Sequence, residues 1–457
     1  MPAGFRTPAL WQLLRYTYSP LQFLEEGARR YGDSFVVRFS MYGKFIILAS
    51  PEAVRDVFRG DGYALHSGES NQFLIPTVGP NSVLVLDEEA HARQRRIQLP
   101  PLKGERMRSF FDAMQSATLE SIGSWPVGEP FRVLEPMQRI TLRVILQAVF
   151  GMTAGVERDE IERKVHRLLA KGRSRYSLLL LKILPLQWLQ KSRRAPFYRE
   201  MASLDESLYA RIAASRGQPA EARGENILAD LIAATGEDGR RLGDQEIRDA
   251  LLTLLLAGHE TTSIALAWAL EQIVPRADVL EKIRNELREV TGGDLPRAEH
   301  LPHLEYLDAA IRESLRVRTI LPIVVRLTKR AFTAGGREYP PGVVLCPCSH
   351  LVHRRPDLYP DPEKFRPERF LERKYAGHEW FPFGGGNRMC LGMAFALYEM
   401  KVVLATLLSH VNLMRPPGGQ SISIRRGLSL APKDGVALIV KETFKGTGQP
   451  LAAGSSR

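Results

Sequence analysis

The sequence predicts a mainly α-helical fold with a smaller β-rich part, and three observations support that class. Apolar residues recur at helical spacing in long segments such as residues 20–31 and 391–408. Residues 244–274 keep a helical pattern for much longer than an ordinary helix does. Two short runs near the N-terminus, 34–39 and 44–49, carry the β-branched and aromatic residues typical of strands. Helical segments therefore account for much more of the chain than strand-like ones.

Composition and charge narrow the class of protein. The chain has 457 residues, 44% of them hydrophobic and 25% charged, which is enough apolar content for a large core. Its formal net charge of +12 suits acidic proteins, nucleic acid or anionic membranes as partners. Because the cationic residues are spread along the chain, we expect no nucleic-acid binding.

Cysteine usage and the N-terminus bear on location. Three cysteines form a sparse, odd-numbered set, which argues against a disulfide framework and favours a reducing compartment. Residues 1–18 lack the uninterrupted apolar core of a signal peptide. No uncharged apolar stretch reaches the roughly 18 residues that a membrane span needs. The sequence therefore predicts a cytoplasmic protein.

The N-terminal third combines helices with the two strand runs. Residues 1–19 are expected to form an extension before the first helix, and residues 52–58 a short helix after the strands. Residues 63–86 show no clear periodicity, and loops of this length are usually functional or mobile. Further helices are predicted at residues 107–122 and 138–150.

A basic cluster lies between these segments, at residues 91–96. His91 and Arg95 are four residues apart, so a helix places both side chains on one face. Taken alone, the pattern is equally typical of a solvated basic face.

The segment 244–274 is predicted to be the central helix. Asp244 suits its N-cap and Pro275 its end, and at 1.5 Å per residue its length of roughly 45 Å would cross a whole domain. Polar residues interrupt its apolar pattern at positions 259–263. Buried polar groups are costly without partners or a purpose. Threonine hydroxyls that bond to the preceding turn also bend helices, so the interruption predicts a kink, a functional site, or both.

A glycine-rich loop near the C-terminus, residues 383–392, carries the third cysteine, Cys390. Glycines 384–386 permit a tight turn, and a helical run follows Cys390. A thiol at a helix N-terminus is expected to have a lowered pKa, which favours the thiolate that binds metals or attacks electrophiles.

This loop resembles the heme-binding loop of the cytochrome P450 family, the heme-thiolate monooxygenases. All five fixed positions match, namely Phe383, Gly386, Arg388, Cys390 and Gly392. The resemblance runs in order from about residue 20 to residue 440 and is nearest to soluble bacterial members. It implies a single domain over residues 20–444 with the cytochrome P450 fold and the long central helix over the heme. Its β-rich part would use residues 34–49, 322–347 and 411–440, and residues 445–457 would form a disordered tail.

The resemblance also implies roles for individual residues. Cys390 would be the iron ligand of heme b (iron protoporphyrin IX). Other cofactor-binding residues would be His91, Arg95, Arg326, Phe383, Arg388 and Gly392, with His91, Arg95 and Arg326 on the propionates. Residues 257–262 match the family's oxygen-activation signature, in which Glu260 and Thr261 would relay protons to dioxygen.

Two further motifs concern the framework and a rival site. Glu313, Arg316 and Arg369 resemble the family's buried three-residue ion network, which is structural. The segment after it departs from the family, because residues 318–320 stand where relatives have an aromatic residue and prolines. Cysteines 346 and 348 and histidines 350 and 353 suggest zinc, although their spacing is tighter than usual.

The resemblance implies a monooxygenase that hydroxylates or epoxidises an apolar substrate such as a fatty acid, terpenoid or steroid-like molecule. The substrate pocket is expected to include Ala257, Gly258, Leu321, Ile323, Val324 and Leu428, with a lid at residues 178–186. Alternatives are a heme-thiolate isomerase or dehydratase, and a non-catalytic heme or ligand-binding protein.

Partners follow from the same comparison. No flavin-binding or ferredoxin-like segment is apparent, so electrons are expected from a separate ferredoxin or flavodoxin and its reductase. Arg93, Arg96 and Arg106 are expected to be exposed and to attract an acidic donor. A monomer is expected.

Overall fold

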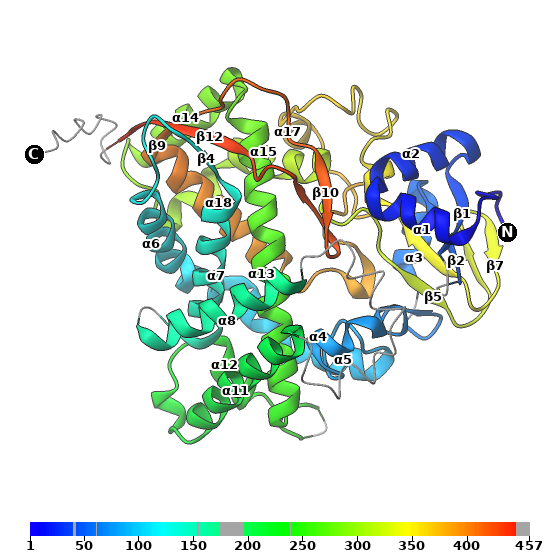
Figure 1. Cartoon of the computed structure of the whole chain (residues 1–457), viewed down its shortest axis with the longest axis horizontal. Coiled ribbons are helices and arrows are strands. Elements are labelled where there is room, and N and C mark those ends of the chain that lie inside the picture. Colours follow the sequence, from blue (N-terminus) through cyan, green and yellow to red (C-terminus); the bar gives the residue numbers. More distant parts are fainter. Residues whose placement is uncertain (40–42, 61, 153–154, 173–195, 238, 445–457) are drawn as a thin grey trace, which may run out of the picture.

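A 30-residue helix, α13 (Asp244–Ile273), runs through the middle of the molecule (Figure 1). The computed structural model describes residues 1–39, 43–60, 62–152, 155–172, 196–237 and 239–444. The Glu246 carboxylate accepts the Gly243 N–H at 2.9 Å and so caps the start of α13. The prediction for residues 244–274 is confirmed, since Pro275 follows the last turn.

Helices pack around α13 and share one large hydrophobic core with it. The long ones are α6 (Phe111–Ile122), α7 (Leu134–Phe150), α8 (Val156–Gly172), α11 (Pro196–Arg216), α14 (Ala277–Thr291), α15 (Glu305–Val317) and α18 (Met393–His410), with the shorter α12 (Ile227–Ala233) beside α7. α7 is buried along most of its length because apolar residues surround it on every side. This helical body lies to the left in Figure 1.

A five-stranded sheet lies on the other side of the molecule. Its strands are β1 (Ser34–Phe39), β2 (Gly43–Leu48), β3 (Leu65–His66), β5 (Arg326–Thr328) and β8 (Val344–Pro347), in the order β1-β2-β8-β5-β3. Only β2 and β8 run parallel within it. Smaller sheets are β4 (Pro130–Arg132), β12 (Ala437–Thr443) and β9 (Val411–Met414), β6 (Phe332–Ala334) with β7 (Arg337–Tyr339), and β10 (Ser423–Arg426) with β11 (Ser429–Pro432). The predicted strand ranges contain these strands except β3 and β4, and β12 extends a little further.

The N-terminal helices pack on the five-stranded sheet. They are α1 (Ala9–Tyr18), α2 (Pro20–Tyr31) and α3 (Pro51–Arg59). Gly4 pairs with Val36 of β1, and Phe5 is buried against the same sheet. Residues 1–19 are thus folded onto the domain. The predicted tail at 445–457 and the predicted lid at 178–186 lie outside the described residues.

Residues 63–122 contain more short turns than the sequence predicts. The aperiodic stretch folds into η1 (Glu69–Leu74) and α4 (Ile75–Val78) before α5 (Glu88–Gln98). A 3₁₀ helix, η3 (Gly104–Phe110), replaces the first turn predicted for residues 107–122. The remaining short elements are η2 (Pro100–Leu102), η4 (Ala220–Ala222), η5 (Ala298–His303), α16 (Ser349–Val352), α17 (Arg369–Glu372) and η6 (Gly386–Arg388).

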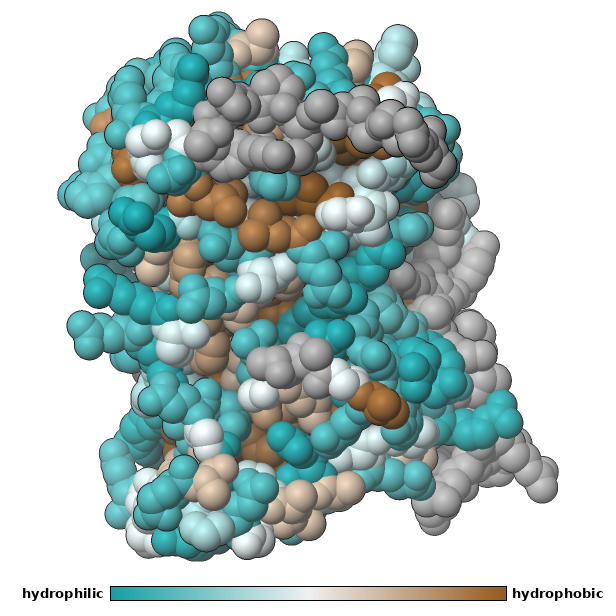
Figure 2. Space-filling model, turned by 90° about the vertical axis from the view of Figure 1, so that its left-hand side faces the viewer, coloured by the Kyte–Doolittle hydropathy of each residue, from teal (hydrophilic) through white to brown (hydrophobic). Residues whose placement is uncertain are grey.

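Exposed large hydrophobic side chains come from many separate parts of the described chain. The face toward the left of Figure 1 is mainly hydrophilic, with hydrophobic residues in a few short patches (Figure 2). By length and composition, α13 and α18 are apolar enough to cross a membrane, and most of each is buried inside the fold. Core helices of soluble proteins meet the same criteria.

Candidate active site

Cys390 follows a turn that only glycine permits. Gly384 and Gly386 have φ angles of +69° and +66°, and η6 begins at Gly386. A Cβ on Gly385 would lie 2.3 Å from the Phe58 ring, and one on Gly386 2.4 Å from the Phe58 carbonyl oxygen. The turn is therefore pressed against the end of α3. The Cys390 N–H donates to the Phe383 carbonyl at 3.0 Å, which closes the loop just before α18.

The thiol of Cys390 differs from the other two in its surroundings. Cys346 and Cys348 are buried, whereas Cys390 borders open space. Burial by nearby protein raises the pKa of the Cys390 thiol, and the Gly392 N–H and Arg95 oppose that rise. In the chain by itself, desolvation therefore acts against the lowered pKa expected of a thiol near a helix N-terminus. A bound cation would be needed to favour the thiolate.

Three arginines and a histidine from three elements meet beside this loop. His91 and Arg95 lie on α5, Arg326 on β5 and Arg388 on η6. Arg95 donates to the Met389 carbonyl at 2.7 Å, and Arg326 to the Gly385 carbonyl at 3.0 Å. The structure thus brings together the cations predicted for the propionates.

Burial and mutual repulsion perturb these cations. They lower the pKa of His91 to about 4, that of Arg326 to about 9 and that of Arg388 to about 10. Grouped buried cations with perturbed pKa values are typical of a site for an anionic ligand. The two propionates of heme b are such anions, and a thiol that borders open space is available to its iron. The residues therefore fit the cofactor that the sequence predicts.

The middle of α13 presents small residues to open space. Ala257 is exposed although most of the helix around it is buried, and Gly258 and Thr261 are half-buried. Thr261 Oγ1 donates to the Ala257 carbonyl at 2.6 Å, a bond of the kind that bends helices. His259 is fully buried on another face, where its Nδ1 lies 3.0 Å from Thr141 Oγ1 of α7. Of the residues around this interruption, His259 is packed inside the fold. Ala257, Gly258 and Thr261 instead lie on a face of the helix that borders open space.

Only some of the predicted pocket residues lie beside the loop or beside an opening. Val324 lies beside the glycine-rich loop 383–392, since a Cβ on Gly384 would be 3.5 Å from its Cγ1. Leu321 and Leu428 are 39% and 41% exposed, as residues beside an opening would be. Ile323 instead packs against the core of the five-stranded sheet and pairs with Cys348. Its main contacts are therefore structural.

Glu313, Arg316 and Arg369 form a closed buried network. Arg316 Nε and Nη2 lie 2.7 and 2.8 Å from the two Glu313 carboxylate oxygens, and Arg369 Nε lies 3.3 Å from Oε1. Arg316 also donates to the His353 and Pro362 carbonyls. All three side chains are at most 3% exposed, so the network joins α15 to the segment around α17.

The arginines expected at a docking face are paired within the chain. Arg93 lies 2.9 Å from Glu246, Arg96 lies 2.7 Å from Glu89 and Glu237, and Arg106 lies 3.2 Å from Asp230. Arg96 is exposed as expected, whereas Arg93 and Arg106 are half-buried, and all three are already engaged in ion pairs.

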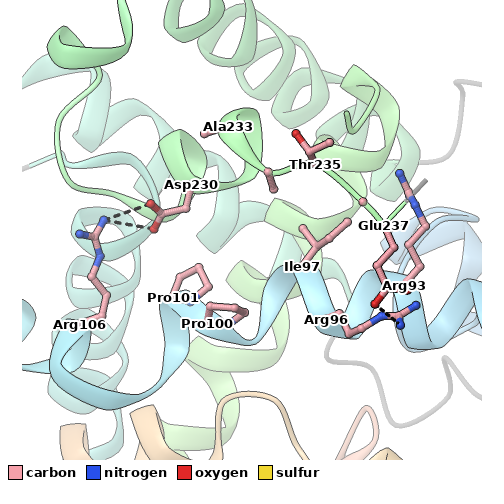
Figure 3. A pocket seen from close by; sticks show the side chains of 12 residues that line it. Arg93, Arg96, Ile97, Pro100, Pro101, Arg106, Asp230, Ala233, Thr235 and Glu237 are labelled. Atoms are coloured by element: carbon pink, nitrogen blue, oxygen red, sulfur yellow. Dashed lines mark hydrogen bonds and ion pairs between the residues drawn. The ribbon is translucent and has the colours of Figure 1, made fainter. Parts of the chain in front are cut away.

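The same three arginines line a cavity of about 630 Å³ together with Pro100 and Pro101 (Figure 3). The cavity lies on the face of α5 opposite His91 and Arg95, away from Cys390.

The zinc alternative fails on geometry. Among the described residues, no three histidine, cysteine or acidic side chains are grouped as metal ligands. His350 Nε2 lies 2.8 Å from Glu25, and His353 Nε2 accepts the Phe381 N–H at 3.0 Å. Burial raises the pKa of the Cys346 and Cys348 thiols, which disfavours their thiolates. These side chains belong to the core.

One residue of the site has no clear signal in the sequence. Asp87 pairs with Arg388, and it comes just before α5 in an acidic stretch that reads as a helix start. Its position next to the basic cluster at 91–96 is the only signal that could have indicated a role. Its partners are distant in sequence, and no local pattern predicts them.

Comparisons with known proteins agree with this geometry. The family model for cytochrome P450 matches residues 2–439. Cytochrome P450 135B1 from Mycobacterium tuberculosis is 34% identical over 457 residues, which cover all of this chain and 95% of that protein. Cytochrome P450 138 from the same species is 34% identical and covers 96% of each chain. Among solved structures, retinoic-acid-bound cyanobacterial CYP120A1 superposes with a TM-score of 0.83 at 25% identity, covering 97% of this chain and 99% of the other.

Proposed function

We propose that this chain, which belongs to the cytochrome P450 family of heme-thiolate monooxygenases, holds its heme through Cys390 and oxidises an apolar substrate. Members of the family bind heme b through a cysteine thiolate and generally take electrons from redox partners. The observation that carries the proposal is the Cys390 thiol, open on one side, beside three clustered arginines and His91. Heme supplies the redox chemistry with dioxygen, in which the thiolate favours O–O cleavage.

The residues of this chain would bind and orient the cofactor. His91, Arg95, Arg326 and Arg388 would neutralise the propionates, since buried charge-assisted hydrogen bonds are strong. The glycine turn 384–386 would let the loop approach the heme closely while Phe58 supports its other side. The decisive measurement is the ferrous–CO spectrum of the purified protein. A strongly red-shifted band is expected, and its absence in heme-loaded protein would overturn the proposal.

Thr261 and Glu260 would deliver protons. Thr261 Oγ1 donates its own proton to the Ala257 carbonyl, so its oxygen can accept a hydrogen bond from the open side. Such a group can hold a proton donor in place, and losing one typically costs about 10²–10⁴-fold in rate. Proton delivery to dioxygen also favours the monooxygenase over the isomerase or dehydratase alternative, which needs none.

Thr261→Ala tests this role, with the neighbouring buried Thr262→Ala as the matched control. In the Thr261 variant, electrons should still be consumed but should leave as peroxide or water. The Thr262 variant should keep the product yield of the unmodified enzyme. Equal product per electron in both variants would exclude the role of Thr261.

The substrate class proposed is an apolar molecule, with carboxylate-bearing amphiphiles foremost. The exposed Leu321 and Leu428 and the small apolar Ala257 support an apolar approach to the site. The cyanobacterial neighbour holds retinoic acid, an apolar chain with a carboxylate. Each buried CH₂ group contributes about 0.8 kcal/mol. Affinity should therefore rise along a fatty-acid series until the pocket is full, as measured by heme spectral shifts. Flat affinity, or tighter binding of polar analogues, would contradict this class.

The electron donor proposed is a separate ferredoxin or flavodoxin with its reductase, and the protein is proposed to act as a cytoplasmic monomer. Because Arg93, Arg96 and Arg106 are already paired, charge reversal there should affect stability as well as reduction. Stopped-flow reduction with ferredoxins and flavodoxins tests the donor class. Turnover that neither class of donor supports would exclude it.

A further inference from the structure

We propose that Asp87 is a positioning residue for the heme site, which fixes the Arg388 guanidinium and links it to the turn at residues 66–69. The inference rests on the proposed function, since Arg388 would face a propionate. It adds a residue that does not touch the heme and acts through its contacts with Arg388.

The Asp87 carboxylate is anchored on both oxygens. Oδ1 accepts the N–H groups of Ser67 and Gly68, each at 2.9 Å, and Oδ2 accepts that of Glu69 at 2.8 Å. Arg388 Nη2 donates to Oδ1 as well. Although Asp87 directly precedes α5, its side chain makes no capping bond to that helix. The carboxylate therefore bonds to the turn and to Arg388, and not to the first turn of α5.

The turn that holds Asp87 is itself tightly placed. A Cβ on Gly68 would lie 2.4 Å from the Leu86 carbonyl oxygen, so only glycine lets the two segments approach this closely. Ser67 Oγ donates to the Val325 carbonyl at 2.9 Å, and Arg326 Nη1 donates to the same oxygen at 2.9 Å. Asp87 thus lies where the turn, β5 and the heme loop meet.

Within the described part of the chain, two acceptors hold the Arg388 guanidinium. Its Nη1 donates to the Val83 carbonyl at 3.3 Å and its Nη2 to Asp87. These two bonds use part of a planar group with five N–H donors. A guanidinium fixed on one edge presents its other donors in a set direction, which is what a propionate would need. Asp87 also places a negative charge beside the cations that would surround the heme.

The test separates the charge of Asp87 from its position. Asp87→Asn removes the charge, and Asp87→Glu keeps the charge but displaces the carboxylate by one CH₂ group. Both variants should lose heme faster, by about tenfold or more, as loss of a supporting partner typically weakens a bound centre. The rate is measured as transfer of heme to apomyoglobin.

The heme reduction potential reports the charge of Asp87 beside the site, whereas heme release reports the position of its carboxylate. Loss of a nearby negative charge favours the reduced iron, so Asp87→Asn should shift the potential upward while Asp87→Glu stays near the unmodified value. If Asp87 only stabilised the turn, Asp87→Asn and Asp87→Glu would have the same heme reduction potential. Glu88→Gln is the matched control, since the neighbouring Glu88 pairs with His66 at 3.0 Å and its side chain is 45% exposed.

Three outcomes decide the proposal. A folded Asp87→Asn protein with unchanged potential and heme release would overturn it. Should that variant not fold, Asp87→Glu decides through heme release alone, and an unchanged rate there would overturn the proposal. Failure of the heme site itself would appear in the unmodified protein, as absence of bound heme or of the red-shifted ferrous–CO band.

Discussion

Two buried clusters of arginine in this molecule differ in what balances their charge. In the first, Glu313 faces Arg316 and Arg369, and backbone carbonyls take further donors. In the second, Arg326, Arg388, Arg95 and His91 are gathered around Cys390 with Asp87 as their close carboxylate. In the first cluster both guanidinium groups bond to a carboxylate, whereas in the second, among the described residues, only Arg388 does, and Arg95 and Arg326 donate to backbone carbonyls. Burial with full pairing indicates a structural role, and burial without it indicates a place for an anionic ligand.

The largest effect is expected at Cys390. This thiol lies within the second cluster, and the first cluster has no corresponding metal ligand. Cys390→His should abolish the red-shifted ferrous–CO band completely, because an imidazole cannot supply the thiolate. Cys348→Ala, which changes a buried thiol in the sheet core, should retain the band. A Cys390→His spectrum like that of the unmodified protein would exclude this cysteine as the ligand.

The next largest effect is expected in the first cluster, formed by Glu313, Arg316 and Arg369. Glu313→Gln leaves two buried guanidinium groups without their counter-ion, and it should lower the free energy of unfolding by about 3–5 kcal/mol. Glu363→Gln is the control, since Glu363 is 74% exposed in its pair with Arg354 and should change stability by at most about 1 kcal/mol. Denaturant unfolding of both variants measures the difference. Similar losses in the two variants would show that the buried network contributes no more to stability than an exposed ion pair.

In the second cluster, around Cys390, a substitution is expected to reduce heme binding and not stability. Arg326→Gln relieves repulsion among the cations, so the heme-free protein should be as stable as the unmodified chain or more so. Heme retention should nevertheless fall by about 10–100-fold, as for other partners that support a bound centre. Arg337→Gln, at an exposed position of β7, is the control. Loss of stability without loss of heme retention would place Arg326 with the structural arginines.

The smallest effect concerns pH. Burial, Arg388, Arg95 and Arg326 lower the pKa of His91 from 6.5 to about 4, against the opposing charge of Asp87. As the pH falls from 6.5 toward 4, the unfolded chain binds a proton that the folded chain does not, so stability is lost in that window.

His91→Gln should remove this part of the acid sensitivity of the heme-free protein. The same pH dependence should be weaker with heme bound, because a propionate favours protonated His91. Urea unfolding between pH 4 and 7 measures both. Identical pH profiles for His91→Gln and the unmodified chain would show that His91 does not titrate in this window.

Local patterns predicted the parts of the molecule that local forces determine. The helix at 244–274 and the strands at 34–39 and 44–49 follow their apolar periodicity closely. The strands β3 and β4 have only two and three residues, too few for a pattern. They exist because partners elsewhere in the sheet supply their hydrogen bonds.

Long-range pairing explains what the sequence did not reveal about the site. The sequence did not reveal that Arg93 and Arg96 form ion pairs with Glu246 and Glu237, because these partners lie more than a hundred residues away in the chain. Asp87 could not be distinguished from an ordinary helix start for the same reason. Desolvation acts against the lowered pKa expected for Cys390, and it depends on packing that no motif encodes. Motifs thus identified residue types at the site, and only the folded chain showed how their charges balance.

The contact between the N-terminal segment and β1 bears on self-association. Val36 donates its N–H to the Ala3 carbonyl and accepts the Phe5 N–H, and Gln12 Oε1 accepts the Arg38 N–H. These bonds occupy the outer side of a strand that would otherwise offer free donors and acceptors to a strand of another molecule. A chain shortened at its N-terminus would keep every residue of the catalytic centre and still tend to aggregate edge to edge.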